Sequence, residues 1–167
     1  MSALVVVMGV TGAGKSTVGT KLAERLGVLF RDADEFHPPA NIAKMSAGQP
    51  LTDDDRWPWL DAIGAHLAAH CGTGCVVTCS ALKRAYRDRL RAAAPGLRFV
   101  HLHGDVALVA ARQAARQGHF MPASLVPSQF ATLETPTPDE GVITLDVAAT
   151  PDALVDEAIA ALREEAR

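Results

Sequence analysis

A glycine-rich loop near the beginning of the chain constrains the fold more than any other sequence feature. Residues 9–16 read Gly-Val-Thr-Gly-Ala-Gly-Lys-Ser, and they lie between the apolar run Leu4–Met8 and a segment with helical periodicity. Glycine adopts backbone angles that other residues avoid, so consecutive N–H groups can surround phosphate oxygens at the positive end of the following helix. The spacing Gly-x4-Gly-Lys-Ser between a strand and a helix therefore predicts a P-loop. An ordinary glycine-rich turn is the alternative, and the complete pattern disfavours it.

A P-loop predicts a bound nucleoside triphosphate. In such loops the lysine, here Lys15, reaches the β- and γ-phosphates, and the hydroxyl of Ser16 is placed for Mg²⁺. The residues expected to contact the nucleotide are Gly9, Thr11, Gly12, Ala13, Gly14, Lys15, Ser16 and Thr17.

Length and charge restrict the class of protein. The 167 residues are enough for one domain that buries most of its apolar surface without disulfides or metals. A net charge of −3 with 21% charged residues argues against a surface that coats nucleic acid. No stretch approaches the roughly 18 apolar residues of a membrane-spanning helix, and the N-terminal apolar run lacks a basic flank. We therefore expect a cytoplasmic protein with neither nucleic acid nor a membrane as a partner.

The basic residues are unevenly distributed along the chain. Eight of the sixteen Lys and Arg residues lie between Lys83 and Arg116, where Asp88 and Asp105 are the only acids. This clustering suggests a local site for anions. A set of solvated helix faces explains it equally well, and the sequence leaves the two alternatives open.

Strand-like and helix-like segments alternate along the chain. Apolar runs at 4–8, 75–79, 97–102 and 142–147 predict buried strands, and 28–32 predicts a shorter one. Helical periodicity occupies 15–26, 83–94, 106–117 and the segment that begins at Thr150-Pro151. Strands that are apolar on both faces and alternate with helices predict an α/β fold with a parallel five-stranded sheet covered by helices on both faces. Ligands bind such sheets at the carboxyl ends of the strands.

Two segments interrupt this alternation within what we expect to be one domain spanning residues 1–167. The first, about 36–72, carries two helical patterns, 38–49 and 53–71, and we interpret it as a substrate-binding insertion. The second, about 112–124, contains Arg112 and Arg116 one helical turn apart, followed by Gly118. A basic segment with a glycine hinge predicts a lid.

Two carboxylates follow the second predicted strand. Asp32 and Asp34 alternate there, so one can face the phosphate site while the other turns toward neighbouring structure. We expect Asp34 to contact an acceptor hydroxyl as a base or as an orienting group, because phosphoryl transfer needs the nucleophile held in line. The third strand ends Thr78-Cys79-Ser80 without an acidic Walker-B residue, which favours Asp32 or Asp34 as the carboxylate near Mg²⁺. An Asp pair that caps a turn is the structural alternative.

The predicted insertion supplies further polar candidates. His37, Asn41, Lys44 and Met45 share one face of a helix or its entrance and could line a polyol pocket, although surface helices are polar by default. Arg56 lies beside the two tryptophans of the chain. An arginine held by aromatic packing suits a two-pronged clamp for a carboxylate, and a structural ion pair is the alternative.

Several blocks together resemble the gluconate kinase family of small P-loop kinases, which is related to the shikimate and adenylate kinases. The P-loop alone would indicate only a superfamily, whereas the His-Pro, Asp-Asp-Arg-x-Pro-Trp and Gly-His-Phe blocks are specific to this family. The resemblance extends over nearly the whole chain. Beyond the P-loop its blocks are residues 32–38, 48–60, 79–83, 86–88, 118–121, 128–130 and 132–134.

The resemblance implies a fold like that of the nucleoside-monophosphate kinases, with a lid. It implies transfer of the ATP γ-phosphoryl group to the 6-hydroxyl of D-gluconate, giving 6-phosphogluconate and ADP, with Mg²⁺ required, and it favours a homodimer. Lys15, Asp34 and Arg116 would act in catalysis, Ser16 and Asp32 at the metal, and Arg112 on adenine. Arg56 would bind the gluconate carboxylate. The residues implied around the polyol are Asp34, His37, Ser80, Lys83, Arg87 and His119.

Two other functions stay open at this point. A related kinase could act on shikimate or another sugar acid, but shikimate kinases carry a glycine cluster after the third strand, where this chain has Ser80-Ala81-Leu82. A nucleotide-dependent switch would need an Asn-Lys-x-Asp motif for guanine. The sole asparagine, Asn41, is followed by isoleucine, which disfavours a switch.

Overall fold

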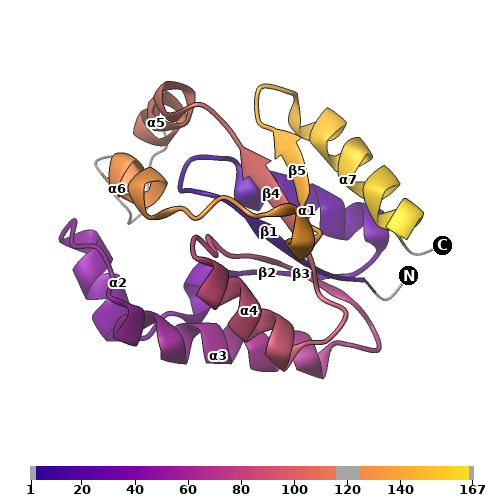
Figure 1. The fold of residues 1–167 in the computed structure, drawn as a ribbon, viewed down its shortest axis with the longest axis horizontal. Helices are drawn as coiled ribbons and strands as arrows, with labels where there is room; N and C mark the ends of the chain where they lie inside the picture. The colour runs from indigo at the N-terminus through magenta and orange to yellow at the C-terminus, as the bar shows by residue number, and fades with distance from the viewer. Residues whose placement is uncertain (1–2, 116–124, 166–167) are drawn as a thin grey trace.

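Five parallel strands form the centre of the molecule (Figure 1). The structure is a computed structural model that describes residues 3–115 and 125–165. The sheet has the order β2-β3-β1-β4-β5, and the predicted parallel sheet is confirmed. Its strands are β1 Leu4–Met8, β2 Leu29–Asp32, β3 Cys75–Thr78, β4 Arg98–His103 and β5 Ile143–Asp146.

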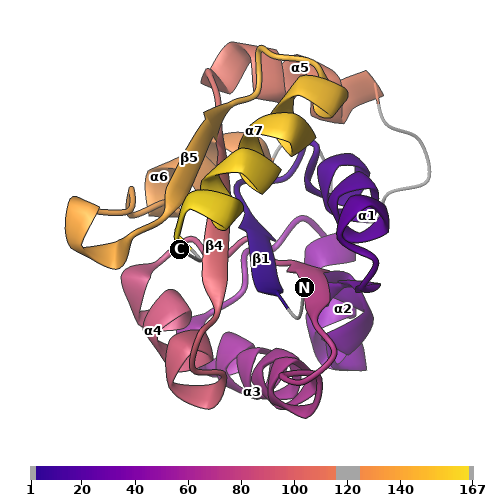
Figure 2. The ribbon, with the colours of Figure 1, turned by 90° about the vertical axis from the view of Figure 1, so that its right-hand side faces the viewer.

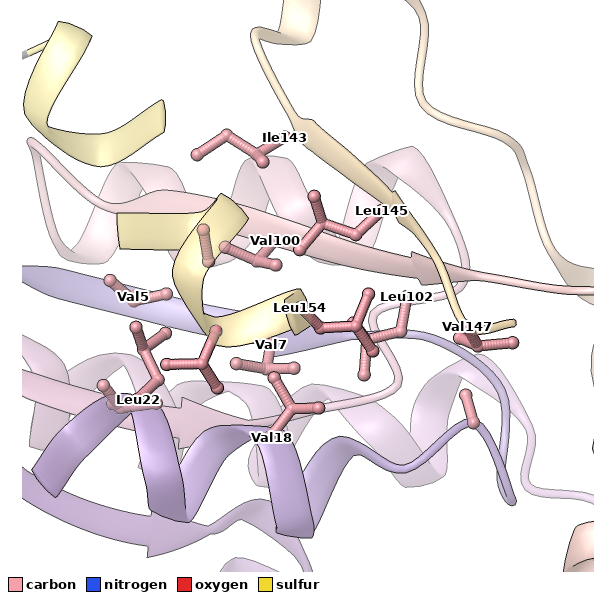
Figure 3. Packing of buried hydrophobic residues seen from close by; sticks show 14 of the residues in the cluster. Val5, Val7, Val18, Leu22, Val100, Leu102, Ile143, Leu145, Val147 and Leu154 are labelled. Carbon is pink, nitrogen blue, oxygen red and sulfur yellow. The ribbon is translucent and has the colours of Figure 1, made fainter. Parts of the chain in front are cut away.

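Helices cover both faces of the sheet, as the sequence predicts. Helices α1 (Lys15–Leu26) and α7 (Pro151–Glu165) pack on one face, and α3 (Asp53–Ala69) and α4 (Arg84–Ala93) pack on the other (Figures 1 and 2). Successive side chains of β1 point to opposite faces of the sheet, so Val5 and Val7 pack in the core beneath α1 and α7 (Figure 3). Val6 joins the α3/α4 core. This two-sided burial explains why the strand reads as a continuous apolar run.

The second strand is the weakest sequence signal because it lies at the edge of the sheet. β2 pairs only with β3, and its residues are alternately exposed and half-buried. Leu29 is 56% exposed. An edge strand that is only partly covered does not need apolar side chains at every position. The apolar run in its sequence is therefore short and mixed with polar residues.

The predicted insertion forms helices α2 (Pro39–Ser46) and α3, and β2 is followed by the 3₁₀ helix η1 (Ala33–Phe36). Helix α5 (Val106–Ala115) begins where predicted, whereas residues 116–124 of the predicted lid lie outside the described residues. Helix α6 (Leu125–Thr132) has no counterpart in the sequence prediction, because eight residues with a proline in the first turn give little periodicity. A second 3₁₀ helix, η2 (Pro138–Glu140), precedes β5. Within the described ranges, no helix has the length and apolar character needed to cross a membrane.

Candidate active site

A cavity of about 710 Å³ lies at the carboxyl ends of the strands. The P-loop, η1, the beginning of α3, the segment after β3, and α6 all contribute to its walls. It brings together ten of the predicted site residues, namely Thr11, Gly12, Lys15, Ser16, Asp32, Asp34, His37, Arg56, Ser80 and Lys83.

The P-loop has the backbone that its glycines predict. Gly9 has φ 149° and Gly14, at the N-cap of α1, has φ 93°. A side chain at position 9 would bring its Cβ within 3.0 Å of the Leu102 carbonyl oxygen, so the loop needs glycine there for space as well as for conformation. The loop therefore leads directly into the N-terminus of α1, where backbone N–H groups favour an anion.

The side chains of Lys15 and Gln129 form hydrogen bonds with the backbone of the P-loop. The Lys15 ammonium donates to the carbonyl oxygens of Gly9 and Val10, at 2.9 and 3.0 Å. From α6, the Gln129 Oε1 atom accepts a 2.6 Å hydrogen bond from the Thr11 backbone N–H. Gln129 lies in the family block 128–130 but is not among the predicted site residues. Its partner Thr11 is 118 positions away, so no local pattern could have indicated this contact.

Ser16 and Asp32 form a pair of oxygen groups beside the loop. The Ser16 hydroxyl donates to Asp32 Oδ2 at 3.1 Å, and Asp32 Oδ1 accepts from the Asp34 backbone N–H at 2.9 Å. A hydroxyl and a carboxylate are the hard oxygen donors that suit Mg²⁺. The described residues contain no cluster of three or more His, Cys, Asp or Glu side chains arranged for a metal. A Mg²⁺ ion here would therefore take most of its ligands from phosphate and water.

Asp32 and Asp34 reach the cavity in a way that differs from the alternation predicted for them. The strand ends at Asp32, and Asp34 belongs to η1. Asp32 caps this 3₁₀ helix, so the turn-capping alternative is also correct for that residue. The tight turn directs both carboxylates to one cavity, whereas a continued strand would have separated them.

His37 is held on two sides at the floor of the cavity. Its ring stacks on Trp59, with centroids 4.1 Å apart and planes inclined by 12°. The Asn41 amide nitrogen lies 3.3 Å from His37 Nδ1. Burial, followed by the charge of Arg56, lowers the pKa of His37 to about 4, so the ring is neutral at neutral pH. His37 Nε2 lies 4.0 Å from Asp34 Oδ1.

Arg56 packs against an aromatic ring, but not against the tryptophans beside it in the sequence. Its guanidinium lies over Tyr86, 5.3 Å from the ring centroid, and Nη1 donates to the Tyr86 hydroxyl at 3.2 Å and to the Leu51 carbonyl at 2.6 Å. Trp59 instead stacks on His37. Among the described residues Arg56 has no ion-pair partner, and its Nε and Nη2 atoms form no hydrogen bond. The side chain is therefore oriented and keeps donors available for a ligand.

Asp53 links two neighbours of Arg56. It accepts hydrogen bonds from the Tyr86 hydroxyl and from the Lys83 ammonium, the latter at 3.1 Å. The bond from Tyr86, followed by that from Lys83, lowers the pKa of Asp53, and Asp53 raises the pKa of Lys83. In the sequence Asp53 is only the first residue of the helical pattern 53–71. Its role beside Arg56 depends on Lys83 and Tyr86, which lie 30 and 33 residues away.

Arg87 does not belong to the cavity, in contrast to the expectation from the resemblance. It is completely buried, and Nε and Nη2 donate to the Glu140 carboxylate at 2.7 and 3.0 Å. The remaining N–H groups donate to the carbonyl oxygens of Ala81, Leu82 and Glu134. All five donors of the guanidinium are thus used within the protein, and none is left for a polyol.

The basic residues from Lys83 to Arg98 form ion pairs within the fold. Each described cation in this range has an acidic partner within 4.0 Å, which disfavours an open anion site there. The pairs of Arg84 and Arg89 are about half-exposed, as the alternative of solvated helix faces predicts. The partners are Asp53 for Lys83, Asp88 and Asp139 for Arg84, Glu140 for Arg87, Asp61 for Arg89, Asp88 and Glu140 for Arg91, and Glu165 for Arg98.

The remaining predicted ligands lie at the margin or beyond the described residues. Thr17 is exposed in the first turn of α1. Arg112, on α5, donates to the Val147 carbonyl at 2.9 Å and does not line the cavity. Arg116 and His119 lie outside the described residues.

Comparison with known proteins identifies a family with these features. Residues 4–136 match the family described as AAA domain. The chain is 53% identical to a gluconokinase of Gluconobacter oxydans (strain 621H) over 92% of this chain and 88% of the relative. It is 45% identical to the thermoresistant gluconokinase of Escherichia coli (strain K12), over 85% and 83% of the two chains.

Solved structures agree with these relatives. A gluconokinase from Sinorhizobium meliloti 1021 superposes with a TM-score of 0.89 at 53% identity, over 97% of this chain and 92% of the other. An unliganded sugar kinase from Janibacter sp. HTCC2649 gives a TM-score of 0.92 at 47% identity, over 98% and 95% of the two chains. With a P-loop, paired carboxylates and an arginine around one cavity, and with this degree of identity, the chain belongs to the gluconokinase family.

Proposed function

We propose that this protein is a gluconokinase that transfers the γ-phosphoryl group of ATP to the 6-hydroxyl of D-gluconate, giving 6-phosphogluconate and ADP. The observation that carries the proposal is that Lys15, Asp34 and Arg56 line the same cavity. A phosphate-binding lysine, a carboxylate for the acceptor hydroxyl and an arginine for the acceptor carboxylate are the three groups that this reaction requires. The names of the family relatives support the same substrate.

The P-loop and Lys15 act on the phosphate side of the reaction. Backbone N–H groups of the loop bind phosphate oxygens, and Lys15 exchanges its carbonyl partners for phosphate. Its charge then stabilises the negative charge that develops on the transferred group. Gln129 must release the Thr11 N–H if that group is also to bind phosphate.

The acceptor side depends on Asp34, Arg56 and their neighbours. Asp34 accepts the proton of the reacting hydroxyl and holds its oxygen in line with the phosphoryl group. The available Nε and Nη2 atoms of Arg56 form a two-pronged contact with the carboxylate at the other end of gluconate. Lys83 and Ser80 line the wall between these positions and contact the polyol hydroxyls.

Mg²⁺ completes the proposal, with Ser16 and Asp32 as the residues that would hold it, directly or through water. When bound, the ion neutralises charge on the β- and γ-phosphates. Asp32 also accepts the Asp34 N–H, so the same side chain fixes the backbone that carries the acceptor carboxylate.

Other parts of the proposal rest on the sequence and on the family resemblance. They are a nucleotide contact by Arg112, phosphate and substrate contacts by Arg116 and His119 in a lid at about 112–124, a homodimer, and a location in the cytoplasm. Hydrogen exchange across residues 112–122, with and without a nonhydrolysable ATP analogue plus gluconate, tests the lid. The expected result is slower exchange in the presence of both ligands.

A coupled assay of ADP release tests the reaction itself. Gluconate, shikimate, other sugar acids, the uncharged alcohol analogue of gluconate and a blank without acceptor are compared at saturating ATP and Mg²⁺. We expect the highest kcat/KM with gluconate and a much lower value with the alcohol analogue, because only gluconate offers a carboxylate to Arg56. Equal rates with gluconate and with no acceptor would disprove the kinase, and a preference for shikimate would change the substrate.

A further inference from the structure

Asn41 makes contacts that determine which ring nitrogen of His37 carries the proton. It is 3% exposed and lies on α2, behind the cavity wall. Its amide nitrogen donates to the Asp55 carbonyl oxygen at 2.9 Å and lies 3.3 Å from His37 Nδ1. A carbonyl oxygen only accepts hydrogen bonds, so the group facing Asp55 must be the NH₂ group of the amide. Its second hydrogen is then available to His37 Nδ1.

This arrangement defines the protonation of His37. With an N–H donor opposite it, Nδ1 has to be the acceptor nitrogen, and the single proton of the neutral ring lies on Nε2. Trp59 stacks on the ring at 4.1 Å and holds its plane, while the contact with Asn41 favours the orientation within that plane in which Nδ1 faces the amide. His37 therefore presents one donor, Nε2–H, on the side where Asp34 lies.

The position of Nε2 relative to Asp34 allows this donor and the carboxylate to bind one hydroxyl group between them. The two atoms Nε2 and Oδ1 are 4.0 Å apart, too far for a direct hydrogen bond. An oxygen about 2.8 Å from each atom fits between them with a nearly right angle at that oxygen. A hydroxyl in this place would accept a hydrogen bond from His37 and donate its own proton to Asp34.

We propose that Asn41 is a positioning residue that fixes His37 with its proton on Nε2, so that His37 and Asp34 hold one acceptor hydroxyl from opposite sides. The identity of that hydroxyl, the 6-hydroxyl of gluconate, rests on the proposed function. The protonation state of His37 does not, because it is a property of the protein without ligand. Asn41 acts only through His37 and takes no part in the transfer of the hydroxyl proton to Asp34.

The first measurement is nitrogen-15 NMR of the histidine rings in the ligand-free protein, with the His37 signals assigned by comparison with His37→Gln. The parent should show a protonated Nε2 and an unprotonated Nδ1. In Asn41→Asp a carboxylate replaces the NH₂ donor, so the Nδ1 signal should become that of a protonated nitrogen. In Asn41→Leu the preference for one ring nitrogen should weaken. A parent protonated at Nδ1, or variants with the parental pattern, would overturn the proposal.

The second measurement is the kinetics of Asn41→Leu, with Lys44→Met as the matched control. Lys44 also joins α2 to α3, through a 2.6 Å ion pair with Asp55. It has no contact with His37 and does not line the cavity, in contrast to the polyol pocket suggested for it by the sequence. Asn41→Leu should lower kcat by about tenfold, the effect of one lost oriented hydrogen bond, with little change in the KM for ATP. Lys44→Met should keep the parental kcat and the parental His37 signals. An equal loss in both variants would show that only the packing of α2 on α3 matters.

The two measurements separate this proposal from the proposed function. If the parent transfers phosphate to gluconate but the His37 signals do not depend on Asn41, the positioning role fails alone. If the signals depend on Asn41 but gluconate is no substrate, the assignment of gluconate as the acceptor fails and the hydroxyl belongs to another acceptor.

Discussion

Arg56 and Arg87 lie on the packed helices α3 and α4, and the family resemblance implies that both bind the substrate. Their surroundings differ completely. Arg87 is fully buried, with all five N–H donors used and a carboxylate as partner, whereas Arg56 uses one nitrogen for the protein and keeps two at the cavity. An arginine in a family-specific block is therefore a ligand only if the fold leaves it donors. The following predictions test this distinction, from the largest effect to the smallest.

Arg87→Met should produce the largest effect, which is a loss of stability. It leaves the Glu140 carboxylate, whose side chain is 1% exposed, without its main partner, so the free energy of unfolding should fall by about 3–5 kcal/mol in urea denaturation. Arg89→Met is the control on the same helix, because its pair with Asp61 is about half-exposed and should cost less than about 1 kcal/mol. A stable Arg87→Met protein with a raised KM for gluconate would restore Arg87 to the substrate site.

Lys15→Ala should mainly affect catalysis. Lys15 contacts backbone carbonyls of the P-loop, so its loss should leave the fold intact while kcat falls by about 10³-fold. Circular dichroism and steady-state kinetics of the same preparation check both parts. Lys21→Ala, on the exposed side of the same helix, should keep the parental kcat. Near-parental turnover of folded Lys15→Ala would place the phosphates elsewhere.

Arg56→Lys should affect the binding of gluconate and leave the binding of ATP nearly unchanged. The ammonium keeps the charge but lacks the planar fork, so we expect the KM for gluconate to rise about 10- to 100-fold with little change in the KM for ATP. Steady-state kinetics with each substrate varied in turn provide the test. The loss should be smaller for the uncharged alcohol analogue, since it has no carboxylate to lose. If both substrates are affected equally, Arg56 supports the general shape of the cavity rather than one ligand.

The smallest expected effect is on the pH dependence of stability. The hydrogen bond from Arg87 contributes most to lowering the pKa of Glu140 to about 2. Because the folded pKa is below the ordinary value for glutamate, the stabilisation is complete above that ordinary value and is lost as the pH falls toward 2. Between pH 5 and pH 3 this pair should contribute a loss on the order of 1 kcal/mol. The free energy of unfolding, measured by urea denaturation at each pH, should depend less steeply on pH in Arg87→Met than in the parent. An equal pH dependence in the two proteins would contradict the pairing of Arg87 with Glu140.

The sequence predicts the sheet and most helices because their signals are local. Helix α1 has the predicted bounds, and the glycines of the P-loop have the positive φ values that the motif needs. Features that depend on distant partners could not be predicted. Glu140 reaches Arg87 from 53 residues away, and Gln129 reaches Thr11 from 118. No periodicity encodes such pairs, so the acidic partners of the basic residues 83–98 could not be predicted from the sequence.

The position of β2 at the margin of the sheet has a consequence for self-association. An unpaired strand edge can template the addition of a strand from another copy, and proteins prevent this with short strands and charged side chains. β2 has four residues, two of which are Arg31 and Asp32. Arg31 is the exposed one of the two, so it places a charge on an edge that could otherwise pair with a second copy. Replacing Arg31 by an apolar residue would remove this charge, so insolubility of such a variant would follow from association at the edge of β2 and not from a change in the cavity.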